Sequence, residues 1–228
     1  MTRERFDRQL QLLLDQVLVL GSMVEQAVLN SLVALKRRDL TAARRIYEQD
    51  QKINEKRYSI ESECVTLIAT QQPMARDVRF LAAILEIITE LERIGDYAKG
   101  ICKINLRLSV ETIDPIILND LQLMAKLGLD MLRRSLDAFV AGDEQIAREI
   151  ADQDNDVDQL YNQMYTKLVD QMIADPASAD RANHMMWAAH NLERMADRVT
   201  NICERIVFVA TGEMSELDTT EGNIFGPN

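Results

Sequence analysis

Leu91-Glu92-Arg93-Ile94-Gly95-Asp96 decides the fold, because this stretch returns 101 residues later as Leu192-Glu193-Arg194-Met195-Ala196-Asp197. Each copy is followed at the same distance by Ile-Cys, so Cys102 and Cys203 keep the same separation. Spacing that is preserved over a whole helical segment indicates that one structural unit is duplicated within the chain. The acids of the repeated segment therefore become candidates for a site that occurs twice.

The repeat extends upstream of this segment with an offset of 104 residues. The matching pairs are Ser31-Leu32 with Ser135-Leu136, Asp39 with Asp143, Ile46 with Ile150, and Gln49-Asp50 with Gln153-Asp154. The change from 104 to 101 predicts a connection three residues longer in the first half, around residues 71–73. We expect two tandem three-helix bundles, one over residues 1–110 and one over 111–211, followed by a flexible tail over 212–228.

Composition favours an all-α fold. The 228 residues are 47% hydrophobic and include only eight glycines and four prolines, and the chain is rich in residues that lose little rotamer freedom in a helix. Apolar periodicity and capping residues predict six helices, over about residues 5–37, 41–71, 74–108, 115–141, 143–174 and 176–210.

Charge and cysteine content narrow the function classes. A net charge of −11 and a pI near 4.7 exclude a nucleic-acid binder, which needs a basic face. An odd number of cysteines within helical pattern indicates buried thiols in a reducing cytosol. The N-terminus has no apolar signal region, and no run approaches 18 uninterrupted apolar residues, so we expect a soluble cytoplasmic protein.

The repeated acids fall at the edge of the apolar face of their helices. Measured from Ile88 at 100° per residue, Glu92 lies at about 40° and Asp96 at about 80°. Glu193 and Asp197 take the same two angles in the second half. We therefore expect all four carboxylates at the rim of a bundle core.

The middle helix of each half adds a second pair at i and i+4: Asp50 with Asn54, and Asp154 with Asp158. Asp50 and Asp154 stand where a bundle takes an apolar side chain. Carboxylates about one helical turn apart on neighbouring helices suit a hard or borderline cation, which would also relieve their repulsion. A solvated acidic face is the alternative for any single pair, and the recurrence of the pairs favours a metal site or an acid network.

Other catalytic signals are absent from the sequence. His190 precedes the second acidic segment, but a position on the helix surface is the simpler interpretation. Glu-x-x-His, Gly-rich phosphate loops, Cys-x-x-Cys and a nucleophile elbow do not occur. The acids therefore lack the partners of an enzyme active site.

The doubled Leu-Glu-Arg segment, the Gln71–Arg79 stretch leading into the first copy, and Asn191–Arg194 in the second resemble the PhoU family over about residues 5–210. The resemblance implies a cytoplasmic negative regulator of phosphate uptake and of the phosphate-starvation response. It further implies an adaptor whose partners are the ATPase of the ABC phosphate transporter and the phosphate-sensing histidine kinase. Homodimers, multinuclear clusters of iron or zinc, and association with the membrane only through partners are also implied.

Carried onto this chain, the resemblance implies two metal sites. The first would use Asp50, Glu92 and Asp96, and the second would use Asp154, Asp158, Glu193 and Asp197. Asn54 replaces a carboxylate in the first, which makes the second the better cation site; Ala196 replaces a glycine and keeps the helix. The competing interpretations are a carboxylate-bridged metal enzyme and a metal-free helical adaptor.

Overall fold

The computed structural model describes residues 3–108 and 113–217. Within these two ranges, seven α-helices and one short 3₁₀ helix follow in order: α1 (Arg3–Arg37), α2 (Leu40–Gln71), α3 (Ala75–Arg107), α4 (Pro115–Ala141), α5 (Glu144–Asp152), α6 (Asp154–Ala174), η1 (Pro176–Ser178) and α7 (Ala179–Thr211). The described residues are helical almost throughout, as the composition predicts. The expected boundary at residues 110 and 111 and the tail residues 218–228 lie outside the described residues.

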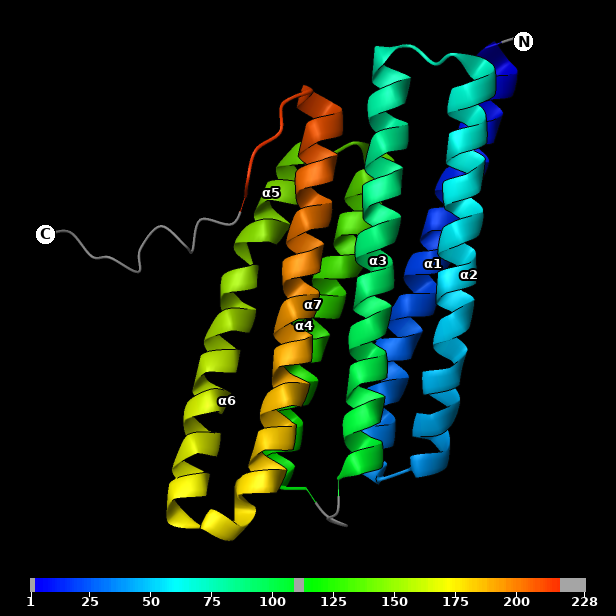
Figure 1. Ribbon diagram of the computed structural model, residues 1–228. Helices are drawn as coiled ribbons and strands as arrows, with labels where there is room; N and C mark the ends of the chain where they lie inside the picture. Colours follow the sequence, from blue (N-terminus) through cyan, green and yellow to red (C-terminus); the bar gives the residue numbers. More distant parts are fainter. Residues whose placement is uncertain (1–2, 109–112, 218–228) are drawn as a thin grey trace, which may run out of the picture.

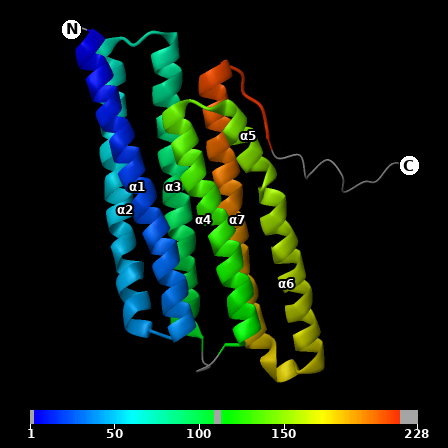
Figure 2. The same cartoon turned by 180° about the vertical axis from the view of Figure 1, so that it is seen from behind.

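The helices form two antiparallel three-helix bundles that stand side by side (Figure 1). The first contains α1, α2 and α3, and the second contains α4, α5 with α6, and α7. Figure 2 shows α1 and α4 on the opposite side of the molecule from α3 and α7. One continuous apolar core runs through both bundles, so the two repeats share their interior.

Local chemistry explains where the helices begin and end. The Asp39 carboxylate accepts a hydrogen bond from the Ala42 N–H at 2.8 Å, and the Asp143 carboxylate accepts one from the Ile146 N–H at 3.1 Å. Both caps satisfy backbone donors that the first turn leaves free. Gly142 ends α4 in the left-handed conformation at φ 68°.

The predicted fifth helix is broken, because α5 ends at Asp152 and α6 begins at Asp154. The Gln153 N–H donates to the Ile150 carbonyl at 3.0 Å, which is a tighter 3₁₀-type turn. The Gln153 side chain accepts a hydrogen bond from Arg134 at 2.8 Å, and the Asn155 amide donates to the Asp152 carbonyl at 3.0 Å. The matching segment of α2 is an uninterrupted helix, so the halves differ at this point.

Helices α3 and α7 are antiparallel and join the two halves about a pseudo-two-fold axis. Asn201 donates to Glu90 at 3.3 Å, and the corresponding residues Gly100 and Asn191 also face each other. Glu90 is buried and forms ion pairs with Arg198 at 3.4 Å and with Arg93 at 3.0 Å. A buried carboxylate with these partners ties the bundles together at their centre.

The two halves differ in how they pack at Gly95 and at its counterpart, Ala196. A Cβ atom on Gly95 would lie 3.1 Å from Cδ1 of Ile53. In the second half Ala196 replaces the glycine, and Val157, which lacks that δ-carbon, replaces the isoleucine. Ala196 and Val157 are both fully buried, so the substitution of glycine by alanine is accommodated by a smaller partner.

Helix α1 is long and apolar enough to cross a membrane by length and composition alone. One of its faces packs into the bundle core through Leu13, Val17, Leu20 and Val24, which are buried. Core helices of bundles commonly pass the same test, so this property is weak evidence for membrane insertion.

The three cysteines are buried and form no disulfide, as the sequence predicts. Burial raises the pKa of Cys64, Cys102 and Cys203 to about 12. These thiols therefore act as small core residues.

Candidate metal site

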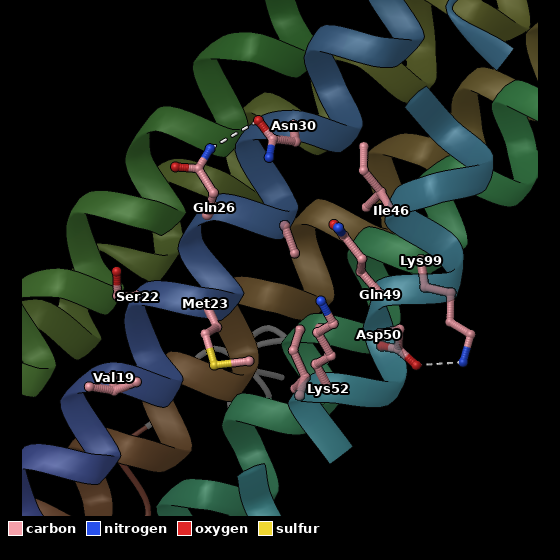
Figure 3. Close-up of a pocket in the computed structure, with 13 residues that line it drawn as sticks. Val19, Ser22, Met23, Gln26, Asn30, Ile46, Gln49, Asp50, Lys52 and Lys99 are labelled. Atoms are coloured by element: carbon pink, nitrogen blue, oxygen red, sulfur yellow. Dashed lines mark hydrogen bonds and ion pairs between the residues drawn. The ribbon is translucent and has the colours of Figure 1, made fainter. Parts of the chain in front are cut away.

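The first acidic set lies where α2 meets α3, and a lysine pairs with two of its three acids. Asp50 is buried, with 5% of its surface exposed, as expected for an acid in a core position. The Lys99 Nζ lies 2.6 Å from Asp50 Oδ2 (Figure 3). The same atom lies 3.6 Å from Asp96 Oδ1. The Asn54 amide donates a longer hydrogen bond of 3.5 Å to the same Asp50 oxygen. The buried carboxylate is thus satisfied by groups of the chain itself.

Glu92 is half-buried beside this pair. Burial, Asp96 and Asp50 raise the pKa of its carboxyl, while Arg57 and Arg93 oppose the rise. Arg57 also pairs with Glu61 at 3.0 Å. The first half therefore places two cations, Lys99 and Arg57, among its candidate ligands.

A groove of about 470 Å³ between α1 and α2 leads to the Asp50–Lys99 pair (Figure 3). Its walls mix apolar side chains with amides, including Met23, Ile46, Gln26, Asn30 and Gln49. The groove gives solvent a route to the ion pair.

The second acidic set lies where α6 meets α7. Asp154 is buried, with 7% of its surface exposed, and the Thr200 hydroxyl donates to its Oδ2 at 3.4 Å. Burial raises the pKa of Glu193 to about 7, and the negative charges of Asp197 and Asp158 add to this rise. Arg194 and Arg198 oppose it. Glu193 is therefore close enough to Asp158 and Asp197 to feel their negative charges.

An aromatic cluster flanks Glu193. His190 Nδ1 lies 3.1 Å from Glu193 Oε2, but the two atoms lack hydrogen-bond alignment. The His190 ring lies 6.1 Å from the rings of both Tyr161 and Trp187. Burial, with a contribution from Arg194, lowers the pKa of His190, so the imidazole is neutral at neutral pH. His190 is thus half-buried beside the acids.

The repeat offsets allow the two halves to be compared position by position. Thr200 corresponds to Lys99, Tyr161 to Arg57, and Asp158 to Asn54. Sequence reasoning missed Lys99 and Arg57, although aligning the two copies would have shown a cation in one and a neutral residue in the other.

Neither half presents an assembled metal centre. Within residues 3–108 and 113–217, no three His, Cys, Asp or Glu side chains are grouped so that they could hold a metal ion. In the first half the donor chemistry does not fit a cation, because Lys99 already pairs with Asp50. In the second half four carboxylates fit a hard or borderline cation chemically, and enclosing one would require their side chains to move.

Comparison with known proteins places these features in a family. A family model described as the PhoU domain matches this chain twice, over residues 17–104 and 121–206. A phosphate-specific transport system accessory protein PhoU homolog of Clostridium acetobutylicum is 33% identical over 219 residues, covering 96% of this chain and 100% of that protein. The phosphate-specific transport system accessory protein PhoU of Escherichia coli K12 is 33% identical over 209 residues, covering 92% of this chain and 86% of that protein.

Solved structures show the same architecture. The phosphate transport system regulatory protein PhoU of Streptococcus pneumoniae has a TM-score of 0.85 at 33% identity and covers 92% of this chain and 99% of that one. PhoU from Pseudomonas aeruginosa has a TM-score of 0.85 at 31% identity and covers 91% of this chain and 100% of that one. Fold, repeat and sequence therefore agree over nearly the whole length.

Proposed function

Because this chain belongs to the PhoU family, we propose that it is an accessory regulator of a phosphate-specific transport system. The observation that carries this proposal is the near full-length match to proteins of that name. Both repeats are matched by the family domain, so the proposal concerns the whole helical unit. The names of these relatives are those of accessory proteins, which supports a regulatory role without catalysis.

At a finer level, the protein is a cytoplasmic negative regulator of phosphate uptake and of the phosphate-starvation response. It links the ATPase of the ABC phosphate transporter to the phosphate-sensing histidine kinase, works as a homodimer and reaches the membrane through these partners. Long helical faces suit this role, because they carry exposed apolar side chains such as Leu12, Val19 and Ile116 that a partner can cover.

Metal binding is proposed for the second half. Asp154, Asp158, Glu193 and Asp197 would hold iron or zinc, and the positive charge would relieve the repulsion between these carboxylates. The raised pKa of Glu193 supports this assignment, since it reflects first the burial of the carboxyl and then the negative charges of Asp197 and Asp158. The first-half acids Asp50, Glu92 and Asp96 differ because Lys99 already pairs with Asp50 and Asp96.

The regulatory role is tested in a bacterial strain that lacks its own PhoU-family gene. We expect this chain to restore repression of phosphate uptake and of an alkaline phosphatase reporter in phosphate-rich medium. Pull-downs from the same cells, with and without phosphate, should recover the transporter ATPase and the sensor kinase. Unchanged reporter activity at normal protein levels would refute the regulatory proposal.

The metal assignment is tested on protein purified without added metal. Glu193→Ala plus Asp197→Ala should lose bound iron or zinc, measured by mass spectrometry. Asp137→Ala plus Glu149→Ala removes two exposed acids of α4 and α5 and is the matched control. Equal metal content and equal repression in both double variants would refute a metal role for the second half.

A further inference from the structure

Lys99 has the position of a bound cation. It stands one helical turn after Asp96 on α3 and reaches across to Asp50 on α2, with Nζ–O distances of 3.6 and 2.6 Å. Its side chain is 23% exposed, whereas that of Asp50 is 5% exposed. The ammonium therefore bridges carboxylates of two helices, as a metal ion between them would.

The corresponding residue of the second half supplies a hydrogen bond without charge. Thr200 occupies the matching place on α7, and its hydroxyl donates to Asp154 at 3.4 Å. In both halves the residue at this position thus donates a hydrogen bond to the buried aspartate of the middle helix. At this position the donor is a cation in the first half, Lys99, and is neutral in the second half, Thr200.

The positions near Lys99 are also more positive in the first half than their counterparts in the second half. Lys99 and Arg57 replace neutral Thr200 and Tyr161, and neutral Asn54 replaces Asp158, so these three positions are three charge units more positive in the first half. Arg198, whose counterpart is Tyr97, offsets one of these units. A cation entering the first half would meet repulsion from Lys99 at a few ångströms.

We propose that Lys99 is the resident cation of the first half, which takes the place of a divalent metal against Asp50 and Asp96 and excludes metal from this half. The inference deepens the proposed function by restricting metal to one repeat. Removing a partner from a buried ion pair leaves an uncompensated charge, so the pair also holds α2 against α3.

The test isolates the first half by means of a background variant, Glu193→Gln plus Asp197→Asn. In this background we expect no Mn²⁺-dependent change in the thermal unfolding midpoint. Adding Lys99→Thr, which installs the second-half residue, should lower the midpoint in chelator, and Mn²⁺ should restore it. Titration calorimetry should show roughly tenfold or tighter Mn²⁺ binding than in the background, because a like charge has been removed.

Two controls define the role of the charge. Lys103→Thr removes a lysine from the next turn of α3, which contacts Tyr47 at 5.6 Å, and should leave Mn²⁺ binding unchanged. Lys99→Arg keeps the charge and should still exclude Mn²⁺. Lys99→Gln, which can still donate to Asp50, serves as the metal-binding variant if Lys99→Thr does not fold.

The proposal is overturned if the background protein binds Mn²⁺ and Asp50→Asn abolishes that binding. It is equally overturned if folded Lys99→Thr and Lys99→Gln proteins gain no Mn²⁺ binding. Failure of the second-half metal site would appear elsewhere, as equal metal content in wild type and background. Failure of the regulatory role would appear only in the reporter strain.

Discussion

Replacing Glu193 by glutamine is expected to stabilise the metal-free protein above pH 7 and to leave its stability unchanged below about pH 4.5. Burial, followed by the charges of Asp197 and Asp158, raises the pKa of this carboxyl from 4.5 to about 7 in the folded protein. The folded state therefore holds the proton more tightly than the unfolded state does. As pH rises from about 4.5 through about 7, the native state loses stability. A glutamine never ionises and avoids that loss.

The difference between these two pKa values sets an upper limit on the effect. At 1.36 kcal/mol per pKa unit it corresponds to about 3 kcal/mol. The Glu193 side chain is 21% exposed, so water screens part of the repulsion and side-chain movement relieves more. We expect the variant to be about 1–2 kcal/mol more stable than wild type at pH 8.

Urea unfolding in chelator at pH 4, 5, 6, 7 and 8 measures this difference directly. All other titrating groups are present in both proteins. The pH dependence of the difference in unfolding free energy between variant and wild type therefore reports on Glu193 alone. Glu92→Gln is the comparison variant, with a smaller effect expected because burial is the main cause of the raised pKa at both positions and Glu92 is less buried than Glu193. A pH-independent difference, or a variant less stable than wild type at pH 8, would refute the reasoning.

Two further predictions concern packing. Gly95→Ala should cost about 1 kcal/mol despite the better helix propensity of alanine, because its Cβ would lie 3.1 Å from Ile53 Cδ1. Adding Ile53→Val should recover most of that loss, and additive free energies in a double-mutant cycle would contradict this explanation. Glu90→Ala should cost about 2–3 kcal/mol in urea unfolding, since it removes the ion pair between the halves and leaves the half-buried Arg198 only the longer contact of 3.9 Å with Asp197. Glu149→Ala on the surface should cost less than about 0.5 kcal/mol, and an equal loss in both variants would rule out a role for Glu90 in joining the bundles.

Much of the fold could be predicted because its determinants are local and repeated. Apolar spacing predicts each helix. Asp39 and Asp143 predict the starts of two helices, and the structure confirms both caps. The break at Gln153 could not be predicted in this way. At the break the Gln153 side chain accepts a hydrogen bond from Arg134 of α4, a tertiary contact that helical periodicity does not reveal. The matching Gln49 lies within an unbroken helix.

The site was only partly predictable, for a different reason. Helical angles place Glu92 and Glu193 at the rim of the core, and core spacing places Asp50 and Asp154 inside it, as observed. These acids could be predicted because they occur in both copies of the repeat. Lys99 and Arg57 could not be predicted from the residues that the copies share, because the second copy has neutral residues at these two positions.

Duplication in this chain has produced a structurally symmetric and electrically asymmetric molecule. The shared core and the antiparallel contact of α3 with α7 hold the two rims in equivalent positions. One rim carries its own cation on Asp50. At the other rim Asp154 accepts a hydrogen bond from the uncharged Thr200 hydroxyl, and Glu193 lies near Asp158 and Asp197, with Arg198 3.9 Å from Asp197. A free cation, or a basic segment of a partner, therefore experiences a stronger attraction at the second rim. The difference gives an otherwise two-fold bundle a defined orientation. Exchanging Lys99 and Thr200 would move one positive charge from the first rim to the second and so cancel the net difference in charge at these positions.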